Sequence, residues 1–431
     1  MAEITLKTHI RLRRGNAAEW AEVNPVLLLG EPGVEIDTNK MKIGDGEKTW
    51  NELSYFAEVE QFEIPGLETA EIGQIAVKGE DGFAWKDEII PMSQAEIKAL
   101  IAQAIANANK GVANVAELRS AFAETGVIKL GADLALGAEP VVIPVGADVV
   151  LNLADHKLTG GESAIQVNGG TLTIQGESGE FEATGRAVVV KNGGKVILES
   201  GKVTSTGHNG IGAVGEGSEI IINGGEVEGQ EYGLNVVDGA KLEINGGIIE
   251  ANDNCAVGGN GSLYVDANGN LTTKVADAVR EQLPIEIIMN GGELISNIQS
   301  RGWIANGVYM PGSCNFTMNG GTIKANGGAG IIIRAGQATL NGGKIITTTN
   351  VVNSTGKAGD SKITNVPCAP IVWDKSANYP KADTMALVIG SAVQFEKPSD
   401  VGKLELLPAD ADMSAITLPV DWDNEAPAAV E

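Results

Sequence analysis

A short motif recurs through the middle of the chain, and its period restricts the possible folds more than any other feature. Two of the repeats read GLNVVDGAKLEINGGIIEAND, from Gly233 to Asp253, and GVYMPGSCNFTMNGGTIKANG, from Gly307 to Gly327. Subtraction gives spacings of 24, 24, 22, 21, 24, 29 and 22 between the last apolar residues before each Asn-Gly-Gly-like corner: Ile174, Leu198, Ile222, Ile244, Val265, Met289, Met318 and Leu340. A sustained period in this range predicts a solenoid.

Each repeat contains three short runs in which Val, Ile and Leu alternate with other residues. Runs of about 3–5 residues are typical of β-strands and too short for amphipathic helices, so a helical or leucine-rich solenoid fits poorly. We therefore predict a mainly β fold dominated by a right-handed parallel β-helix, with three strands and about 21–24 residues per coil. Residues 130–395 would supply about 12 coils, stacked ~4.8 Å apart.

Two corners of the coil recur in near-register. A polar residue follows each aligned apolar position, at Gln175, Glu199, Asn223, Asn245, Asp266, Asn290, Asn319 and Asn341. Asn followed by Gly suits a corner with positive φ, and stacked amides are expected to form a hydrogen-bonded ladder. A second ladder, of glycines, precedes the middle run, at Gly170, Gly194, Gly217, Gly239, Gly261, Gly312 and Gly336.

The repeats lose their register in a few places. The repeat before Met289 contains VADAVREQLP in place of a wall strand, which predicts a helical turn, and the repeat before Met318 is longer than the others. Beyond Leu340 the pattern loosens, although 371–373 and 386–393 still resemble strands. Residues 396–431 are acidic and lack the repeat, so they predict either a tip or a partly mobile tail.

Composition excludes several classes of protein. The chain has 431 residues, 57 of them Gly without a three-residue period, which excludes collagen and fits a turn-rich solenoid. A formal charge of −25 argues against nucleic acid as a partner. The three cysteines are far apart and are expected to be buried apolar residues, with no disulfide framework, metal site or cofactor: Cys255, Cys314 and Cys368.

The N-terminal 60 residues predict a small α/β domain. Alternation from Ile4 to Arg13 predicts a half-buried strand with a basic outer face, and a helix is expected over 17–23. The hairpin is predicted to pair Val34 and Ile36 with Met41 and Ile43 across the Thr38-Asn39 turn. Trp50, Leu53 and Tyr55 are expected to close the core, and Asp45, between two glycines, is expected to cap the backbone.

This segment also carries a specific pattern, G-E-x-G-V-E-x-D-T-x-x-x-K-I-G-D-G-x-x-x-W, from Gly30 to Trp50. With its surroundings, the pattern resembles the N-terminal domain of phage tail fibres and receptor-binding proteins, a group that includes the major tropism determinant and phage hyaluronidase-type fibres. The resemblance implies attachment to a virion, usually as a homotrimer. It brings no catalytic residue.

Three further segments follow. Residues 61–92 are similar to linkers of phage structural proteins and predict a hairpin that turns at Gly79 to Gly82. Residues 93–111 predict a helical stalk with a Ser93–Glu96 capping box, packed on its own domain or in a short three-chain coiled coil. Residues 112–395 open like pectate-lyase-like β-helices, with a helix over 115–124 that caps the first coil and protects its strand edges.

Catalytic candidates are weak. Polysaccharide-cleaving β-helices need paired carboxylates on adjacent coils, and Glu228 stacks on Glu250 with Glu182 in a similar position. A chain with 56 acidic residues produces such stacks by chance. His156 and His208 lack a nucleophile at a meaningful offset and are expected in exposed turns, so no catalytic residue is predicted.

Aromatic residues make up only 4% of the chain, which makes their positions informative. Aromatic faces are common platforms for sugar rings and partner loops, although local packing would also account for them here. A ligand site is expected in the two places where the ladder breaks. One lies around 301–309, in the long repeat whose extra residues include Gln299, and the other lies after Leu340. The ligand-binding candidates are Arg301, Trp303, Tyr309, Trp373 and Tyr379.

These observations favour a non-enzymatic phage fibre, anchored in the virion by its N-terminal domain and presenting a β-helix to a host-surface glycan. A tailspike polysaccharide depolymerase and a capsid-decorating head fibre are the alternatives. The expected partners are the chain itself in a homotrimer, other tail, baseplate or capsid proteins, and host polysaccharide. With no leader pattern and no apolar run near about 18 residues, we expect synthesis in the host cytoplasm and no membrane insertion.

Overall fold

The computed structural model describes residues 13–38, 40–56, 75–79, 82–86, 111–259, 264–268, 271–272, 275–297, 305–348, 351–352, 366–375 and 384–424. The chain divides into two compact units, Met1–Ala104 and Ile105–Glu431. The strand predicted over 4–13 lies outside the described residues except for Arg13, where a strand does begin, and the stalk helix predicted over 93–111 lies outside them except for its last residue.

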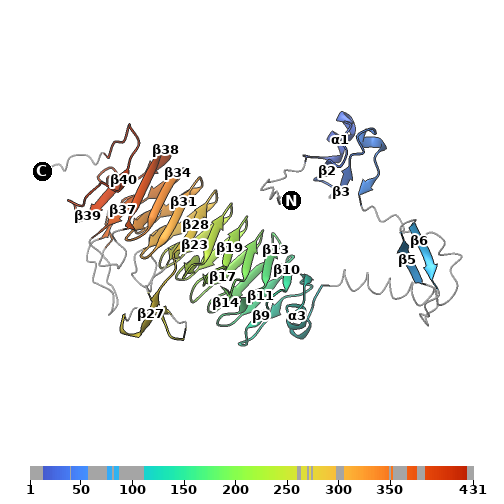
Figure 1. Cartoon of the computed structure of the whole chain (residues 1–431), viewed down its shortest axis with the longest axis horizontal. Helices are drawn as coiled ribbons and strands as arrows, with labels where there is room; N and C mark the ends of the chain where they lie inside the picture. The colour runs from blue at the N-terminus through green and yellow to red at the C-terminus, as the bar shows by residue number, and fades with distance from the viewer. Residues whose placement is uncertain are drawn as a thin grey trace, which may run out of the picture. The chain divides into compact units, whose positions relative to one another are not determined.

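The described part of the first unit contains a four-stranded sheet in the order β1-β2-β3-β4 and a short α-helix (Figure 1). Strand β1 pairs parallel with β2, whereas β2 and β4 pair antiparallel with β3. Trp20 stacks on Trp50 at 4.1 Å between ring centroids and forms the core with Leu27 and Leu53. The elements are β1 (Arg13–Gly15), α1 (Ala17–Val23), β2 (Pro32–Glu35), β3 (Lys40–Ile43), η1 (Trp50–Glu52) and β4 (Tyr55–Phe56).

The hairpin of this unit corrects the predicted pairing. Val34 pairs with Met41 as expected, but Ile43 pairs with Pro32, and Ile36 lies exposed in the turn. The buried face instead carries Glu35, whose carboxylate accepts hydrogen bonds from the hydroxyls of Thr38 and Tyr55.

Two other predictions for the first unit hold. Asp45 accepts hydrogen bonds from the backbone N–H groups of Glu47 and Lys48, at 3.0 and 2.8 Å, and so caps its turn as expected. The predicted linker hairpin is also present, with β5 (Ile75–Gly79) antiparallel to β6 (Gly82–Lys86) and Gly79 opposite Gly82.

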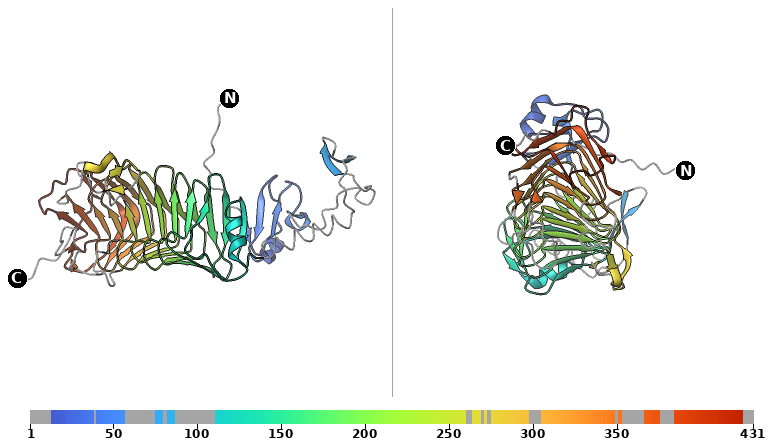
Figure 2. Two further views of the ribbon diagram at one scale, coloured as in Figure 1. Left: turned by 90° about the horizontal axis from the view of Figure 1, so that it is seen from below. Right: turned by 90° about the vertical axis from the view of Figure 1, so that its left-hand side faces the viewer.

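The second unit is a parallel β-helix with three walls, named A, B and C in the order in which each coil visits them (Figures 1 and 2). Wall A is the ten-stranded sheet formed by β9 (Val141–Ile143), β12 (Ile165–Asn168), β15 (Val188–Lys191), β18 (Ile211–Val214), β21 (Leu234–Val237), β24 (Val257–Gly259), β30 (Val308–Met310), β33 (Ile331–Ile333), β37 (Ile371–Asp374) and β39 (Leu404–Leu407).

Walls B and C join through the long strands β34 (Gln337–Thr347) and β38 (Ala386–Glu396), whose first and second halves belong to B and C respectively. Wall B also contains β7 (Gly126–Lys129), β10 (Asp148–Asn152), β13 (Thr171–Gln175), β16 (Lys195–Leu198), β19 (Glu219–Ile222), β22 (Lys241–Ile244), β28 (Ile285–Met289), β31 (Cys314–Met318) and β40 (Ile416–Thr417). Wall C also contains β8 (Leu134–Ala135), β11 (Lys157–Gly160), β14 (Glu180–Ala183), β17 (Lys202–Ser205), β20 (Glu226–Gly229), β23 (Ile248–Ala251), β29 (Glu293–Ser296) and β32 (Thr322–Ala325).

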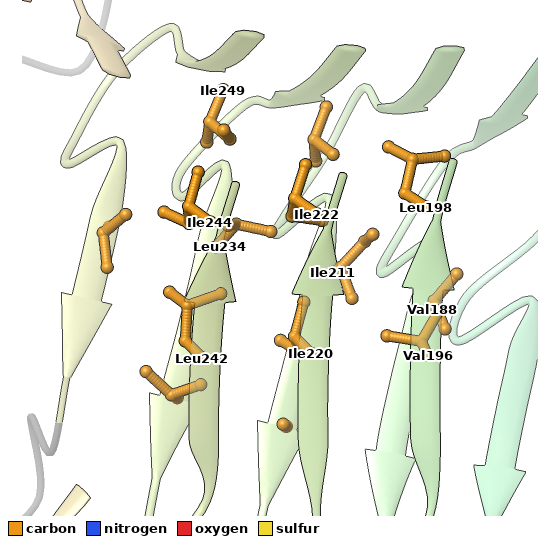
Figure 3. Packing of buried hydrophobic residues seen from close by; sticks show 14 of the residues in the cluster. Val188, Val196, Leu198, Ile211, Ile220, Ile222, Leu234, Leu242, Ile244 and Ile249 are labelled. Atoms are coloured by element: carbon orange, nitrogen blue, oxygen red, sulfur yellow. The ribbon is translucent and has the colours of Figure 1, made fainter. Parts of the chain in front are cut away.

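Parallel pairing places equivalent residues of successive coils in columns. The predicted alignment is confirmed from Ile174 to Leu198, Ile222 and Ile244, each opposite the next and fully buried. Figure 3 shows Leu198, Ile222 and Ile244 stacked from coil to coil. Full burial of one such side chain contributes about 1.5–3 kcal/mol, so the apolar columns are the main source of stability.

A short helix caps the first coil, as predicted. Helix α3 (Val115–Ala121) begins at Asn114, whose side chain accepts a hydrogen bond from the Glu117 N–H. Leu118 and Phe122 are fully buried against the open end of the core. Arg119 donates to the carbonyls of Leu136 and Pro140, at 2.7 and 3.1 Å, and so satisfies acceptors at this end.

Val265 is not a wall residue, which corrects the predicted ladder. Ile244 pairs directly with Met289, and three short strands between Tyr264 and Glu281 form a separate antiparallel sheet outside the walls. The VADAVREQLP segment is a 3₁₀ turn followed by a strand of this added sheet, and it replaces no wall strand. The elements are β25 (Tyr264–Asp266), β26 (Leu271–Thr272), η2 (Val275–Asp277) and β27 (Ala278–Glu281).

One ion pair joins the added sheet to the solenoid. Both guanidinium Nη atoms of Arg280 contact the carboxylate of Asp238, at 2.6 and 2.8 Å, and the Asp238 N–H donates to the Gln282 side chain. Because the added sheet and the stretch between β34 and β37 contribute no wall strand, wall A has ten strands in the described part of the chain rather than the predicted twelve or so. The strands β39 and β40 extend the pairing beyond residue 395, where the sequence pattern had ended.

The asparagine ladder at the corner between walls B and C is confirmed. The Nδ2 of Asn245 donates to Oδ1 of Asn223, and Asn290, Asn319 and Asn341 continue the series, each bond 2.8–2.9 Å long. Asp266 is absent from it, since the added sheet lies outside the walls. The sequence did not reveal a second, shorter ladder at the corner between walls C and A, in which Asn326 donates to Asn297 and Asn297 donates to the carboxylate of Glu250.

We predict that two neighbouring residues of β19 respond very differently to truncation. Ile222→Ala should lower the free energy of unfolding by about 2–5 kcal/mol, because Ile222 is fully buried in the core. Ile221→Ala should cost less than about 1 kcal/mol, because that side chain points outward and is only half-buried. Urea unfolding of the two variants measures the difference, and equal losses would contradict the assigned register.

Candidate functional site

The long connections of the solenoid each begin or end at a strand of wall A. Regular coils use short connections on either side of it, such as 238–240 and 252–256, and the corner between walls B and C stays short even at 319–321. Loops carry function more often than the scaffold that positions them, so the outer face of wall A from β21 to β30 is the candidate site, whereas farther along the outward Ile332 and Val372 are buried. The long connections are 260–284, 297–307, 348–370 and 375–385.

The aromatic ring of Tyr232 lies directly on this face. Asn235, Gly258 and Tyr309 are paired across adjacent strands and occupy one outward column of wall A. A Cβ atom on Gly258 would fall 2.4 Å from the Tyr232 ring, so the glycine provides the space in which this ring packs. The ring therefore has a fixed position, which lowers the entropic cost of binding a ligand.

A second aromatic ring is held by a buried ion pair. The Arg334 guanidinium donates to Asp374 at 2.8 Å through Nε and to the Tyr309 hydroxyl at 3.0 Å through Nη1. The carbon at the centre of the guanidinium lies 5.5 Å from the centroid of the Tyr309 ring, within cation–π range. Arg334 and Asp374 are 9% and 3% exposed. Because the planar guanidinium of Arg334 bonds to Asp374 and to the Tyr309 hydroxyl at once, it fixes the orientation of Tyr309.

Polar groups line the corner that precedes wall A. His208 Nδ1 lies 3.0 Å from Glu231 Oε2, so His208 has an acidic partner that the sequence did not reveal. Gln230 donates to the fully buried carboxylate of Asp253, and Asn306 is also buried nearby in this corner. Asp253 and Asn306 therefore hold the corner together, whereas the partly exposed His208 and Glu231, with the rings, supply polar groups suited to hydroxyl groups of a sugar.

The structure describes two of the five predicted ligand residues and supports a surface position for one of them. Arg301, Trp303 and Tyr379 lie outside the described residues, so their roles stay predictions. Tyr309 is half-buried on the outer face of wall A. Trp373 is fully buried inside the solenoid opposite Ile333, where it has no face for a ligand, and we withdraw the role predicted for it.

Sequence reasoning missed Tyr232, Gly258 and the Arg334–Asp374 pair. The signal for Gly258 was a glycine in the middle of an apolar strand, which often marks the close approach of another group. Arg334 and Asp374 are 40 residues apart and meet only because β33 pairs with β37.

The stacked glutamates on wall C are bound by lysine. Glu228 lies opposite Glu250, as the alignment predicted, but Lys202 Nζ contacts Glu228 at 2.8 Å and Glu226 at 2.6 Å. Burial acts to raise the pKa of Glu228, yet the hydrogen bonds from Lys202 and Asn252 outweigh it and hold the pKa below its usual value. A general acid requires the opposite shift, so the geometry fits a structural ion pair.

Other chemistry can be assessed from the described parts of the chain. Burial raises the pKa of the Cys255 thiol to about 12, so this group is not a nucleophile near neutral pH. Within the described ranges, no cluster of three or more His, Cys, Asp or Glu side chains is placed to hold a metal ion. None of the helices described has the length and apolar run that a membrane crossing requires.

We predict that replacing Lys202 with Met destabilises the protein in a pH-dependent way. The pKa of Glu228 is lower in the folded protein than its ordinary value of 4.5, so the ionised carboxylate stabilises the fold at any pH above 4.5. This stabilisation is lost as the pH falls below 4.5 and through the pKa that Glu228 has in the folded protein. The difference in urea midpoint between wild type and Lys202→Met should therefore be largest near neutral pH and shrink below about pH 4.5. Lys129→Met is the control, because Lys129 is exposed and has no ion pair among the described contacts. A pH-independent difference would contradict the assignment.

Comparisons with known proteins agree with this architecture. Residues 10–48 match the family described as the major tropism determinant N-terminal domain. A hyaluronoglucosaminidase of Streptococcus pyogenes phage H4489A is 44% identical over 46 residues, which cover 11% of this chain and only 12% of that relative. No solved structure matches the chain significantly. These similarities, together with the parallel β-helix, support a protein of the phage tail-fibre type.

Proposed function

We propose that this protein is a virion fibre that docks on a phage particle through its first unit and binds a host-surface glycan on the outer face of wall A. The observation that carries the first part is the match of residues 10–48 to the tropism-determinant domain. The second part is supported by the long connections that begin or end at wall A and by the two fixed rings, Tyr232 and Tyr309.

A parallel β-helix is well suited to this task. Wall strands from β12 to β37 are each hydrogen-bonded to a neighbour on both sides, so the outer face of wall A is held in one geometry before the ligand arrives. Preorganisation of this kind raises affinity by reducing the ordering cost of binding. Several copies on one particle would strengthen a weak single contact further through multivalency.

We extend the proposal to a homotrimer that forms through the N-terminal part of the chain. Three copies would carry 3 × −25 = −75 formal charges, which opposes contact between whole solenoids. Residues 13–56 contain five Lys or Arg and eight Asp or Glu, so this stretch carries only 5 − 8 = −3. Light scattering of the purified chain tests the oligomeric state, and a monomer would contradict this part of the proposal.

Adhesion is favoured over cleavage of the glycan. The relative whose name denotes a glycosidase matches over 46 residues, too few to include the solenoid. The Glu226, Glu228 and Lys202 cluster is a lysine-bound ion-pair network rather than an acid–base pair. Release of reducing ends from a bound glycan would instead favour a depolymerase, and labelled antibodies on whole particles would distinguish a tail from a head location.

We predict that truncating either ring weakens binding to a bacterial envelope preparation that the wild-type chain binds. Tyr232→Ala and Tyr309→Ala should each lower affinity at least tenfold, a change of about 1.4 kcal/mol, since each removes a fixed aromatic face. Thr317→Ala is the matched control on the outer face of wall B. Co-sedimentation gives the affinities, and unchanged binding by both tyrosine variants would exclude wall A as the site.

A further inference from the structure

Large apolar side chains are strongly exposed in one short stretch of the first unit. Val23, Val26, Leu28 and Leu29 are 70%, 49%, 75% and 82% exposed, whereas Leu27 between them is fully buried in the core. Scattered exposed apolar residues need no explanation, but a contiguous group on a small unit is typical of an interaction site. We call these four exposed side chains the leucine ridge.

Backbone hydrogen bonds fix the ridge in place. The Glu31 N–H donates to the Leu28 carbonyl at 2.9 Å, and the Glu31 carboxylate accepts from the Leu28 N–H at 2.8 Å. Gly30, with φ of +80°, completes a turn that carries Leu29 at its tip. The Gly30 N–H also donates to the Gly44 carbonyl at 2.8 Å. The tip is therefore rigid and ordered before any partner binds.

Leu29 has no local reason to occupy this position. Turn tips favour Pro, Asn, Asp, Ser or Gly, because these residues suit the backbone angles or hydrogen-bond to it. At Leu29, which is 82% exposed, an apolar side chain instead gains little stabilisation from burial against the described residues of its own unit. The missing stabilisation is gained only if another surface covers the ridge.

We infer that the leucine ridge inserts into an apolar groove on another protein of the virion and is the contact by which the fibre docks. This inference rests on the proposed attachment through the first unit. A turn tip is convex, and a convex tip buries most area in a concave pocket, where anchors of this kind dominate binding. The ridge spans only the seven residues from Val23 to Leu29, so two ridges facing each other would make a small contact beside the roughly 800 Å² per partner of a stable interface, and the proposed trimer contact would lie elsewhere in the N-terminal part.

The test uses particles of the phage that encodes the chain, assembled with full-length variants. Leu28→Asp with Leu29→Asp should reduce the amount of fibre per particle at least tenfold, because two charges cannot enter an apolar groove. Leu28→Ser with Leu29→Ser is a milder second variant in case the first folds poorly. The control is Val127→Asp with Val145→Asp, since these solenoid residues are similarly exposed, at 72% and 77%.

Each outcome has a defined meaning. Loss of fibre with both leucine variants, with circular dichroism and melting like those of wild type and full incorporation of the valine control, supports the ridge. If deletion of residues 1–56 removes the fibre but the leucine variants incorporate normally, the ridge is wrong and attachment through the first unit stands. If the deletion has no effect, the proposed attachment fails, and the ridge fails with it. If the leucine variants instead change the oligomeric state of the purified protein, the partner is a second copy and the inferred groove is wrong.

Discussion

The parallel backbone hydrogen bonds between successive coils determine the rest of the solenoid. They fix the register of every wall strand, so that a side chain in one coil lies opposite its equivalent in the next, as Leu198, Ile222 and Ile244 do. An inward column must then be apolar along its whole length, and an outward column must place compatible charges or amides next to each other. Extra residues can enter only at the corners, where they leave the register of the walls intact.

Much of this could be predicted because repetition makes the pattern visible. The column through Ile222 repeats large apolar residues and the column through Asn245 repeats asparagine, and both columns are present in the structure. Val265 misled the alignment because the added sheet has nearly the length of one coil and contains its own apolar alternation. Only the pairing of Ile244 with Met289 shows that this stretch lies outside the walls. Alternation also failed at Glu35, since hydrogen bonds from two hydroxyls allow its carboxylate to be buried.

The candidate site was harder to predict, because its residues do not repeat. Scarcity of aromatic residues pointed to Tyr309, but nothing in the sequence links Tyr232 to Gly258 or Arg334 to Asp374. Walls B and C, by contrast, satisfy their own charges: Lys195 pairs with Glu219 at 2.6 Å, as does Lys241 with Glu286 at 2.9 Å. Exposed pairs of this kind contribute little stability each, but they balance charge along those faces. On wall A the ion pair of Arg334 with Asp374 is buried instead.

The asparagine ladder has a direction. Every amide donates through Nδ2 to the oxygen of the coil before it, and the first donor, Asn223, ends on the carboxylate of Glu199. The second ladder likewise starts on a carboxylate, since Asn297 donates to Glu250 and Asn326 then donates to Asn297. A carboxylate suits this first position because only an acceptor is needed there. Each ladder thus resembles a polymer with an initiating group and identical later units, so whole coils could be gained or lost in evolution without redesigning either end. The length of the solenoid would then be adjustable by duplication alone.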